Sequence, residues 1–90
     1  METPKPLDEL LHRLQEIVQV DYVFDEEVLV ITSVCDPDIE VKATMLQDCD
    51  LLKVWGYAEL NTFDVVIDSS SDKMDGLCSL VASFIKIAEP

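Results

Sequence analysis

The chain is short of positive charge and of long apolar runs. Only six lysines and arginines stand against 19 aspartates and glutamates, so the formal net charge is −13 at pH 7. A surface of this sign repels phosphates, which disfavours direct binding to nucleic acid or to an anionic membrane. The apolar runs, such as Val28–Ile31, fall far short of the ~20 residues that a membrane-spanning helix needs. We therefore expect neither nucleic acid nor a membrane among its direct partners.

Glycine, proline and cysteine are also scarce. Two glycines and four prolines, of which only Pro37 lies within the body of the chain, exclude a low-complexity or glycine-rich phosphate-binding segment. The cysteines Cys35, Cys49 and Cys78 are odd in number and none shows CxxC spacing, which favours a reduced environment. Each thiol is expected to act as a small buried hydrophobe. Because the first residues lack the pattern of a secretory signal, we expect a cytoplasmic protein.

Motifs for catalysis and for metal binding are missing. His12 is the only histidine and belongs to the polar side of a predicted helix, so no nucleophile has an evident base. The acids from Asp36 to Glu40 resemble the start of a calcium loop, but Val41 and Gln47 occupy the places of the required glycine and glutamate. A zinc site needs about four nitrogen or sulfur ligands, whereas this chain has one histidine and three scattered cysteines. We expect a protein that is not an enzyme and holds no metal or cofactor.

Two helices are predicted from apolar residues at helical spacing. The first extends from Leu7 to about Val20, with Pro6 in its first turn, and the second follows Asp72. Their apolar stripes comprise positions 7, 10, 11, 14, 17 and 18 in the first, and 74, 77, 78, 81, 84, 85 and 88 in the second. With 90 residues, 49% of them hydrophobic, the chain is expected to form one domain of residues 1–90, in which 1–6 are a flexible tail.

Between these helices the period changes to that of four or five strands. Strands are predicted at 20–24, 28–34, 39–45, 51–60 and 63–68. An acidic turn at 25–27, a Pro37-centred turn at 35–38, loops at 47–50 and 69–72 and a tight connection at 61–62 separate them. Gly56 is a weak point of the fourth strand, where we expect a β-bulge. Short connections predict a mainly antiparallel sheet in an α+β fold, with both helices packed on one face and the other face exposed.

The predicted sheet region, with its strands and turns together, is almost purely acidic. No basic residue occurs between Arg13 and Lys42, or between Lys53 and Lys73. This surface is either an ordinary solvated face that maintains solubility or a patch shaped for a partner rich in lysine and arginine. In the second case it could imitate a nucleic-acid backbone. The candidate partner-binding acids are Asp21, Asp25, Glu26, Glu27, Asp36, Asp38, Glu40, Asp64 and Asp68.

Two aromatic residues complete the candidate site. Trp55 and Tyr57 share one side of a predicted strand, in which they alternate with Val54 and Ala58. If the two small residues point inward, the aromatic pair points outward among acids, as at many binding hot spots. In the opposite phase Trp55 belongs to the core, and the sequence leaves both phases open.

The leading functional hypothesis is a small acidic protein-binding module that inhibits or antagonises a basic or nucleic-acid-binding protein, as phage and bacterial inhibitory proteins do. The alternative is an adaptor that holds a partner chain through apolar surface as a dimer. Its helix–sheet–helix order resembles that of type III secretion chaperones, but no residue motif carries this resemblance and no site residue is inferred from it. The partner is thus expected to be a protein, and the chain itself a monomer or a homodimer.

Overall fold

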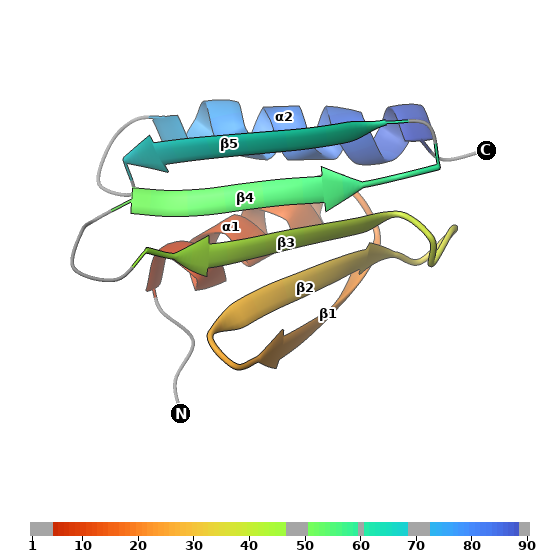
Figure 1. Cartoon of the computed structure of the whole chain (residues 1–90). Helices are drawn as coiled ribbons and strands as arrows, with labels where there is room; N and C mark the ends of the chain where they lie inside the picture. The colour runs from red at the N-terminus through yellow and green to blue at the C-terminus, as the bar shows by residue number, and fades with distance from the viewer. Residues whose placement is uncertain (1–4, 47–50, 60, 69–72, 89–90) are drawn as a thin grey trace.

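The computed structural model describes residues 5–46, 51–59, 61–68 and 73–88. Two helices enclose five strands in the chain order (Figure 1). The elements are α1 (Lys5–Ile17), β1 (Val20–Asp25), β2 (Val28–Ser33), β3 (Glu40–Met45), β4 (Leu51–Tyr57), β5 (Thr62–Asp68) and α2 (Lys73–Ala88).

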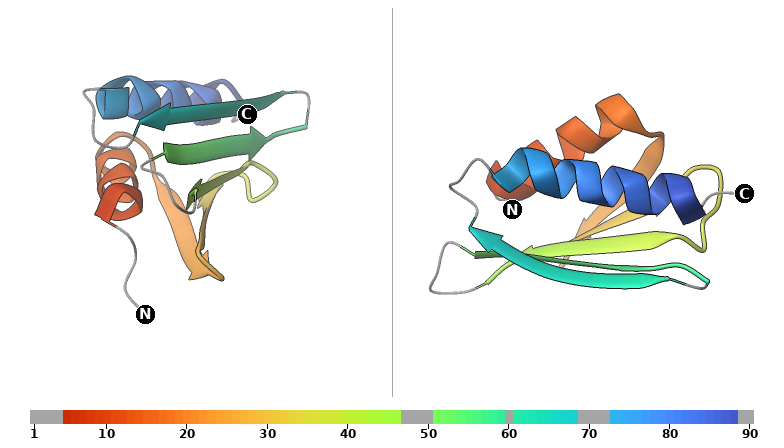
Figure 2. Two further views of the ribbon diagram at one scale, coloured as in Figure 1. Left: turned by 60° about the vertical axis from the view of Figure 1, so that its left-hand side comes forward. Right: turned by 90° about the horizontal axis from the view of Figure 1, so that it is seen from above.

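The five strands form one antiparallel sheet in which neighbours in sequence are neighbours in space. Its order is β1-β2-β3-β4-β5. Both helices lie on the same side of this sheet, as the view from above in Figure 2 shows. The predicted α+β arrangement, with one covered and one exposed sheet face, is therefore confirmed. Among the described residues neither helix is long and apolar enough to cross a membrane.

The acidic turn between β1 and β2 has a defined geometry. Glu26 and Glu27 have φ angles of 50° and 70°. Positive φ at both central residues is typical of a two-residue type I′ hairpin, whose twist matches that of the strands. The hydroxyl of Thr44 donates a hydrogen bond to the Glu27 carbonyl oxygen at 2.9 Å, which anchors the turn to β3.

The predicted turn around Pro37 is also confirmed. The backbone N–H of Asp38 donates to Oδ1 of Asp36 at 3.1 Å, and the N–H of Ile39 donates to the Asp36 carbonyl at 3.1 Å. Asp36 thus closes the turn with both its side chain and its backbone, as aspartate commonly does.

The core lies between the helices and the covered face of the sheet. Arg13 of α1 forms an ion pair with Asp75 of α2, and it also pairs with Glu9 at 2.9 Å. The largest fully buried side chains include leucines, isoleucines and valines from both layers. The buried residues of α1 are Leu7, Leu10, Leu11 and Leu14, and those of α2 are Met74, Leu77, Cys78, Val81, Ala82 and Ile85.

The first helix differs from its prediction at both ends. It begins at Lys5, so Lys5 and Pro6 belong to the helix rather than to the expected tail. It ends at Ile17, because the chain must turn before β1 begins at Val20. Ile17, predicted in the apolar stripe, is 45% exposed. Residues 1–4 lie outside the described part of the chain.

The predicted bulge at Gly56 is wrong. β3 and β4 pair without interruption from Glu40 opposite Tyr57 to Met45 opposite Leu52. Glycine is needed here for space, because a Cβ at this position would collide with the Phe63 ring and lie 3.1 Å from the ring of Phe84. The strand also ends at Tyr57, three residues earlier than expected.

The cysteines follow the prediction in part. Cys78 is buried, and desolvation raises the pKa of its thiol, an effect that Arg13 opposes and Glu9 reinforces. Cys35 is exposed, contrary to the prediction, because it precedes the turn that Asp36 closes at the surface. The predicted loops at 47–50 and 69–72, and with them Cys49, lie outside the described residues.

Candidate functional site

One side of the sheet faces away from both helices and is left uncovered. We call it the open face. Burial alternates along β2, β3 and β4, since successive side chains of a strand point to opposite sides. The open face consists of Asp21, Val23, Asp25, Val28, Val30, Thr32, Glu40, Lys42, Thr44, Leu51, Lys53, Trp55, Tyr57, Thr62, Asp64, Val66 and Asp68.

The strand pairing places Trp55 in a row that crosses the whole sheet and has Lys42 of β3 at its middle. Trp55 lies opposite Lys42 on one side and opposite Asp64 on the other. Lys42 in turn faces Val30, which faces Val23 of the edge strand. Residues directly opposite one another have Cβ atoms about 5 Å apart, so this row forms one continuous strip.

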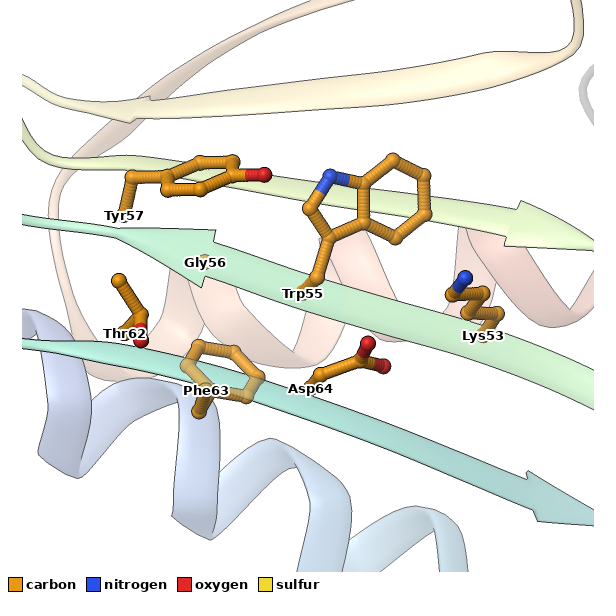
Figure 3. A pocket seen from close by; sticks show the side chains of 7 residues that line it. All are labelled: Lys53, Trp55, Gly56, Tyr57, Thr62, Phe63 and Asp64. Carbon is orange, nitrogen blue, oxygen red and sulfur yellow. The ribbon is translucent and has the colours of Figure 1, made fainter.

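The phase of β4 that the sequence left open is now settled. Val54 is fully buried, Trp55 is half-buried on the open face and Tyr57 is 52% exposed. Figure 3, in which the helices lie behind the sheet, shows both aromatic side chains on the near side of β4. The Nζ atom of Lys53 lies 5.6 Å from the centre of the Trp55 ring, a cation–π contact.

A depression of about 500 Å³ lies beside the aromatic pair, over β4 and β5. Asp64 reaches toward Trp55 from β5 (Figure 3). An aromatic wall next to a carboxylate suits a cationic or planar side chain, which can stack on the ring and donate hydrogen bonds to the acid. The lining residues are Lys53, Trp55, Gly56, Tyr57, Thr62, Phe63 and Asp64.

Two lysines at the centre of the open face were not part of the predicted site. Lys42 and Lys53 flank Trp55, and Lys42 lies 3.4 Å from Glu40. The strict alternation of Glu40, Lys42 and Thr44 in the sequence already placed Lys42 on the polar side of its strand. The position of Lys53 beside the aromatic pair followed only once the phase of β4 was known.

The structure divides the candidate acids into three groups. Asp21, Asp25, Glu40, Asp64 and Asp68 lie on the open face, with Trp55 and Tyr57. Glu26 and Glu27 lie at the tip of the β1–β2 hairpin. Asp36 and Asp38 line a second depression of about 470 Å³ that they share with Ile39, Tyr57, Ala58, Glu59 and Ala88.

Tyr57 joins two of these groups, because it lines both depressions. In an antiparallel meander the β2–β3 and β4–β5 connections lie at the same end of the sheet. That end brings Asp36, Asp38 and Glu59 to the margin of the open face, whereas the hairpin tip with Glu26 and Glu27 lies at the opposite end (Figure 1).

The helix side of the molecule carries the only histidine. His12 lies on α1 with its side chain 67% exposed, and its Nδ1 is 3.6 Å from Asp8. It therefore sits in the layer opposite the open face and cannot serve a group bound there. Within the described ranges no three or more His, Cys, Asp or Glu side chains are grouped so that they could hold a metal ion.

Comparison with protein-family models, with characterised proteins and with solved structures finds no match for this chain. Its function is accordingly inferred from its own residues.

Proposed function

We propose that this protein is a small non-enzymatic binding module that engages a basic or nucleic-acid-binding protein and inhibits it. The observation that carries the proposal is the open face, where the partly exposed Trp55 and the exposed Tyr57 lie among acids on the side of the sheet that neither helix covers.

The aromatic pair supplies the anchoring surface. Trp55 and Tyr57 are among the residue types that dominate binding energy at protein interfaces, because they bury a large area at little cost in side-chain entropy. Trp55 is the only tryptophan of the chain, and it is not required to fill the core. Val30 and Val23, which lie beyond Lys42 in the same row, add apolar side chains to this surface.

The surrounding charge selects the partner. The open face has five acids and two lysines, and Lys42 is already close to Glu40. The negative groups at both ends of the sheet extend this field beyond the face. A basic partner would be attracted from a distance and oriented before contact, which mainly raises the rate of association.

Inhibition follows from the chemistry of such a partner. A protein that binds nucleic acid through lysines and arginines presents a surface complementary to the carboxylates of the open face. Occupation of that surface would exclude the nucleic acid. The central lysines distinguish this mode from simple imitation of a phosphate backbone, since the specific contacts would come from Trp55 and Tyr57 and the acids would steer the approach.

The test compares capture of a partner from native lysate by the wild type and by matched variants. Trp55→Ala should weaken binding by about 30-fold or more, as expected for an interface hot spot. Asp64→Lys should slow association, whereas Glu16→Lys, the same charge change on the exposed side of α1, should have a much smaller effect. Binding kinetics by surface plasmon resonance would measure both effects.

Salt and a polyanion separate the possible results. Raising the salt from about 0.1 M to 1 M shortens the Debye length from about 10 Å to 3 Å and should release the partner. Heparin or duplex DNA should compete for it. Binding that survives salt and is unchanged by Trp55→Ala would refute the proposal.

A second candidate, an adaptor that holds a partner chain by apolar surface, is favoured by one observation. A groove between β5 and α2 is lined mainly by apolar residues, among them Leu80, Phe84 and Ile87. This adaptor would bind its partner in a salt-tolerant manner. It would lose binding on Ile87→Lys and keep it on Trp55→Ala.

A further inference from the structure

The edge of the molecule formed by β5 and α2 leaves apolar side chains uncovered. Within the described residues β5 pairs with β4 alone, and α2 runs beside it on the helix side of the sheet (Figures 1 and 2). A groove of about 300 Å³ lies between the two elements. Its lining residues are Asn61, Thr62, Phe63, Leu80, Ser83, Phe84 and Ile87.

The hydrophobic core reaches the surface along this edge. Three residues of β5 point to the helix side and pack against the core, yet remain only partly buried: Phe63, Val65 and Ile67. On α2, Leu80 is 42% exposed and Ile87 is 75% exposed. Apolar residues on both layers of one edge therefore remain in contact with water, which favours their burial against another molecule.

Charge indicates what covers this edge. Of all 90 residues 28% are charged, but α2 has no charged residue between Asp75 and Lys86. A basic partner would find no carboxylate on this stretch of helix. Two copies of a chain with a net charge of −13 repel one another, and their repulsion is least where each presents a neutral surface. We infer that the chain forms a two-fold symmetric homodimer through the β5 edge and α2.

The strand sequence fits this symmetry. When two β5 strands pair antiparallel along their whole length, the axis passes through Val65, Asp64 lies opposite Val66 of the second copy, and Thr62 lies opposite Asp68 of the second copy. No acid then directly faces an acid. A shift of one strand by two residues in either direction keeps each side chain on its own face of the sheet. It would place Asp64 opposite Asp64 or Asp68 of the second copy, which is destabilising.

The helices support the same axis. α2 follows β5 and runs back along it, so the middle of α2, near Leu80, lies beside the middle of β5, near Val65. A two-fold axis through both points packs α2 antiparallel to its copy. Leu80 then lies near the axis, and Ile87 reaches toward the first turns of α2 in the second copy. Such an isologous contact closes the assembly at two chains.

The edge is large enough for a stable dimer. β5, with seven residues, and α2, with 16 residues, are each about 24 Å long. The two layers together are about 20 Å deep, which gives a flat footprint of about 500 Å². The accessible area of an uneven surface exceeds its footprint and approaches the ~800 Å² per partner that is usual for specific complexes.

The dimer would also enlarge the proposed binding surface, although the inference does not depend on that function. The two sheets would continue into one another, with all four helices on one side. The open faces of both copies would then form one continuous surface, available to a partner.

Sedimentation velocity of the purified protein, from micromolar to millimolar concentration in about 0.5 M salt, tests the inference. The salt screens the net charge, with a Debye length of about 4 Å. We expect a monomer–dimer equilibrium that salt strengthens. A monomer at every concentration would overturn the inference.

Two variants that place opposite charges at the same position locate the interface. Ile87→Lys and Ile87→Glu should both weaken dimerisation, on the order of 100-fold, because each substitution removes two buried side chains from the symmetric contact. The lysine variant is decisive, since it lowers the net negative charge and would strengthen a dimer held elsewhere. Ile17→Lys makes the same charge change at an exposed isoleucine of α1 and should not weaken the dimer. Circular dichroism confirms that the variants fold.

A cross-link tests the register. Val65→Cys in a Cys35→Ser, Cys49→Ser background places two thiols directly opposite one another at the axis, with Cβ atoms within about 5 Å. Oxidation should produce a covalent dimer, whereas Val23→Cys on the other sheet edge should produce none. A dimer that is insensitive to Ile87→Lys, or that fails to cross-link through position 65, would overturn the proposed interface.

Discussion

Replacing Gly56 by alanine would insert a methyl group into the contact between β4 and two phenylalanine rings. Phe63 of β5 and Phe84 of α2 pack edge to face, with ring centres 4.7 Å apart and planes inclined by 66°. Gly56 lies beneath this pair, and a Cβ there would collide with Phe63 and come within 3.1 Å of Phe84. The absence of a side chain at position 56 allows the aromatic pair to close the core near the end of the sheet.

Two opposing effects determine how much Gly56→Ala changes the free energy of unfolding. Alanine is favoured over glycine within a strand by about 0.5–1 kcal/mol, because glycine loses more backbone entropy on folding. Overpacking a core costs about 1–3 kcal/mol. Phe63 is partly exposed at the sheet edge and its ring can tilt outward, which places the cost toward the middle of that range. We expect Gly56→Ala to lower the free energy of unfolding by about 1 kcal/mol.

A double-mutant cycle with Phe63→Ala provides the sharper test. Removal of the ring frees the space that the methyl group would occupy, so Gly56→Ala should then raise stability by about 0.5 kcal/mol. The sign of the effect thus reverses, with a coupling between the two positions of about 1–2 kcal/mol. Urea denaturation, followed by circular dichroism and by the fluorescence of Trp55, measures all four proteins. Additive effects, or a Gly56→Ala single variant more stable than the wild type, would refute the steric argument.

Two further predictions concern the hairpin and the buried thiol. Replacing Glu26 and Glu27 by Asn and Gly should raise the free energy of unfolding by about 1–2 kcal/mol, because both positions have positive φ. A Gln-Gln variant is the control, since it removes the same charges without relieving the backbone strain. Equal stability of the two variants would show that charge, not backbone strain, causes the effect. Burial raises the pKa of the Cys78 thiol in the folded protein above its value in the unfolded chain. The stabilisation that depends on the neutral thiol is therefore complete at a pH below the unfolded-state pKa. It is lost as the pH rises through the folded-state pKa. The difference in unfolding free energy between wild type and Cys78→Ala should therefore shrink under alkaline conditions, and a difference that stays constant in urea titrations up to that range would be inconsistent with a raised pKa.

The elements of the fold could be predicted because their periods are distinct. Helical spacing identified α1 and α2, and alternation identified β3 and β5, since each pattern places one apolar side toward the core. The limits of α1 were less predictable. Ile17 fits the helical stripe by spacing, but its exposure depends on where the chain turns into β1, which no local pattern specifies.

The phase of β4 could not be derived from its own residues. Both sides of this strand contain apolar side chains, with Leu52 and Val54 on one side and Leu51 and Trp55 on the other. The sequence alone predicts a weak point of the strand at Gly56, whereas in the structure this position lies against the rings of Phe63 and Phe84. The information that places Trp55 on the open face therefore lies in the two rings that fill the space over Gly56, seven and 28 residues beyond that glycine.

These features indicate which departures from local preference serve the fold and which do not. Gly56 interrupts a strand but is explained by close packing within the core. Trp55 is different, because a small domain that exposes part of its only tryptophan gives up stabilisation that burial would provide. Glu26 and Glu27 likewise adopt a backbone conformation that glycine and asparagine favour. Strain and exposure that the fold does not require are expected at binding surfaces. Trp55→Ala should therefore weaken partner binding by about 30-fold or more, while it changes the unfolding free energy less than Phe84→Ala, which removes a ring packed against the core. The reverse order of the two unfolding free energies would assign Trp55 to stability.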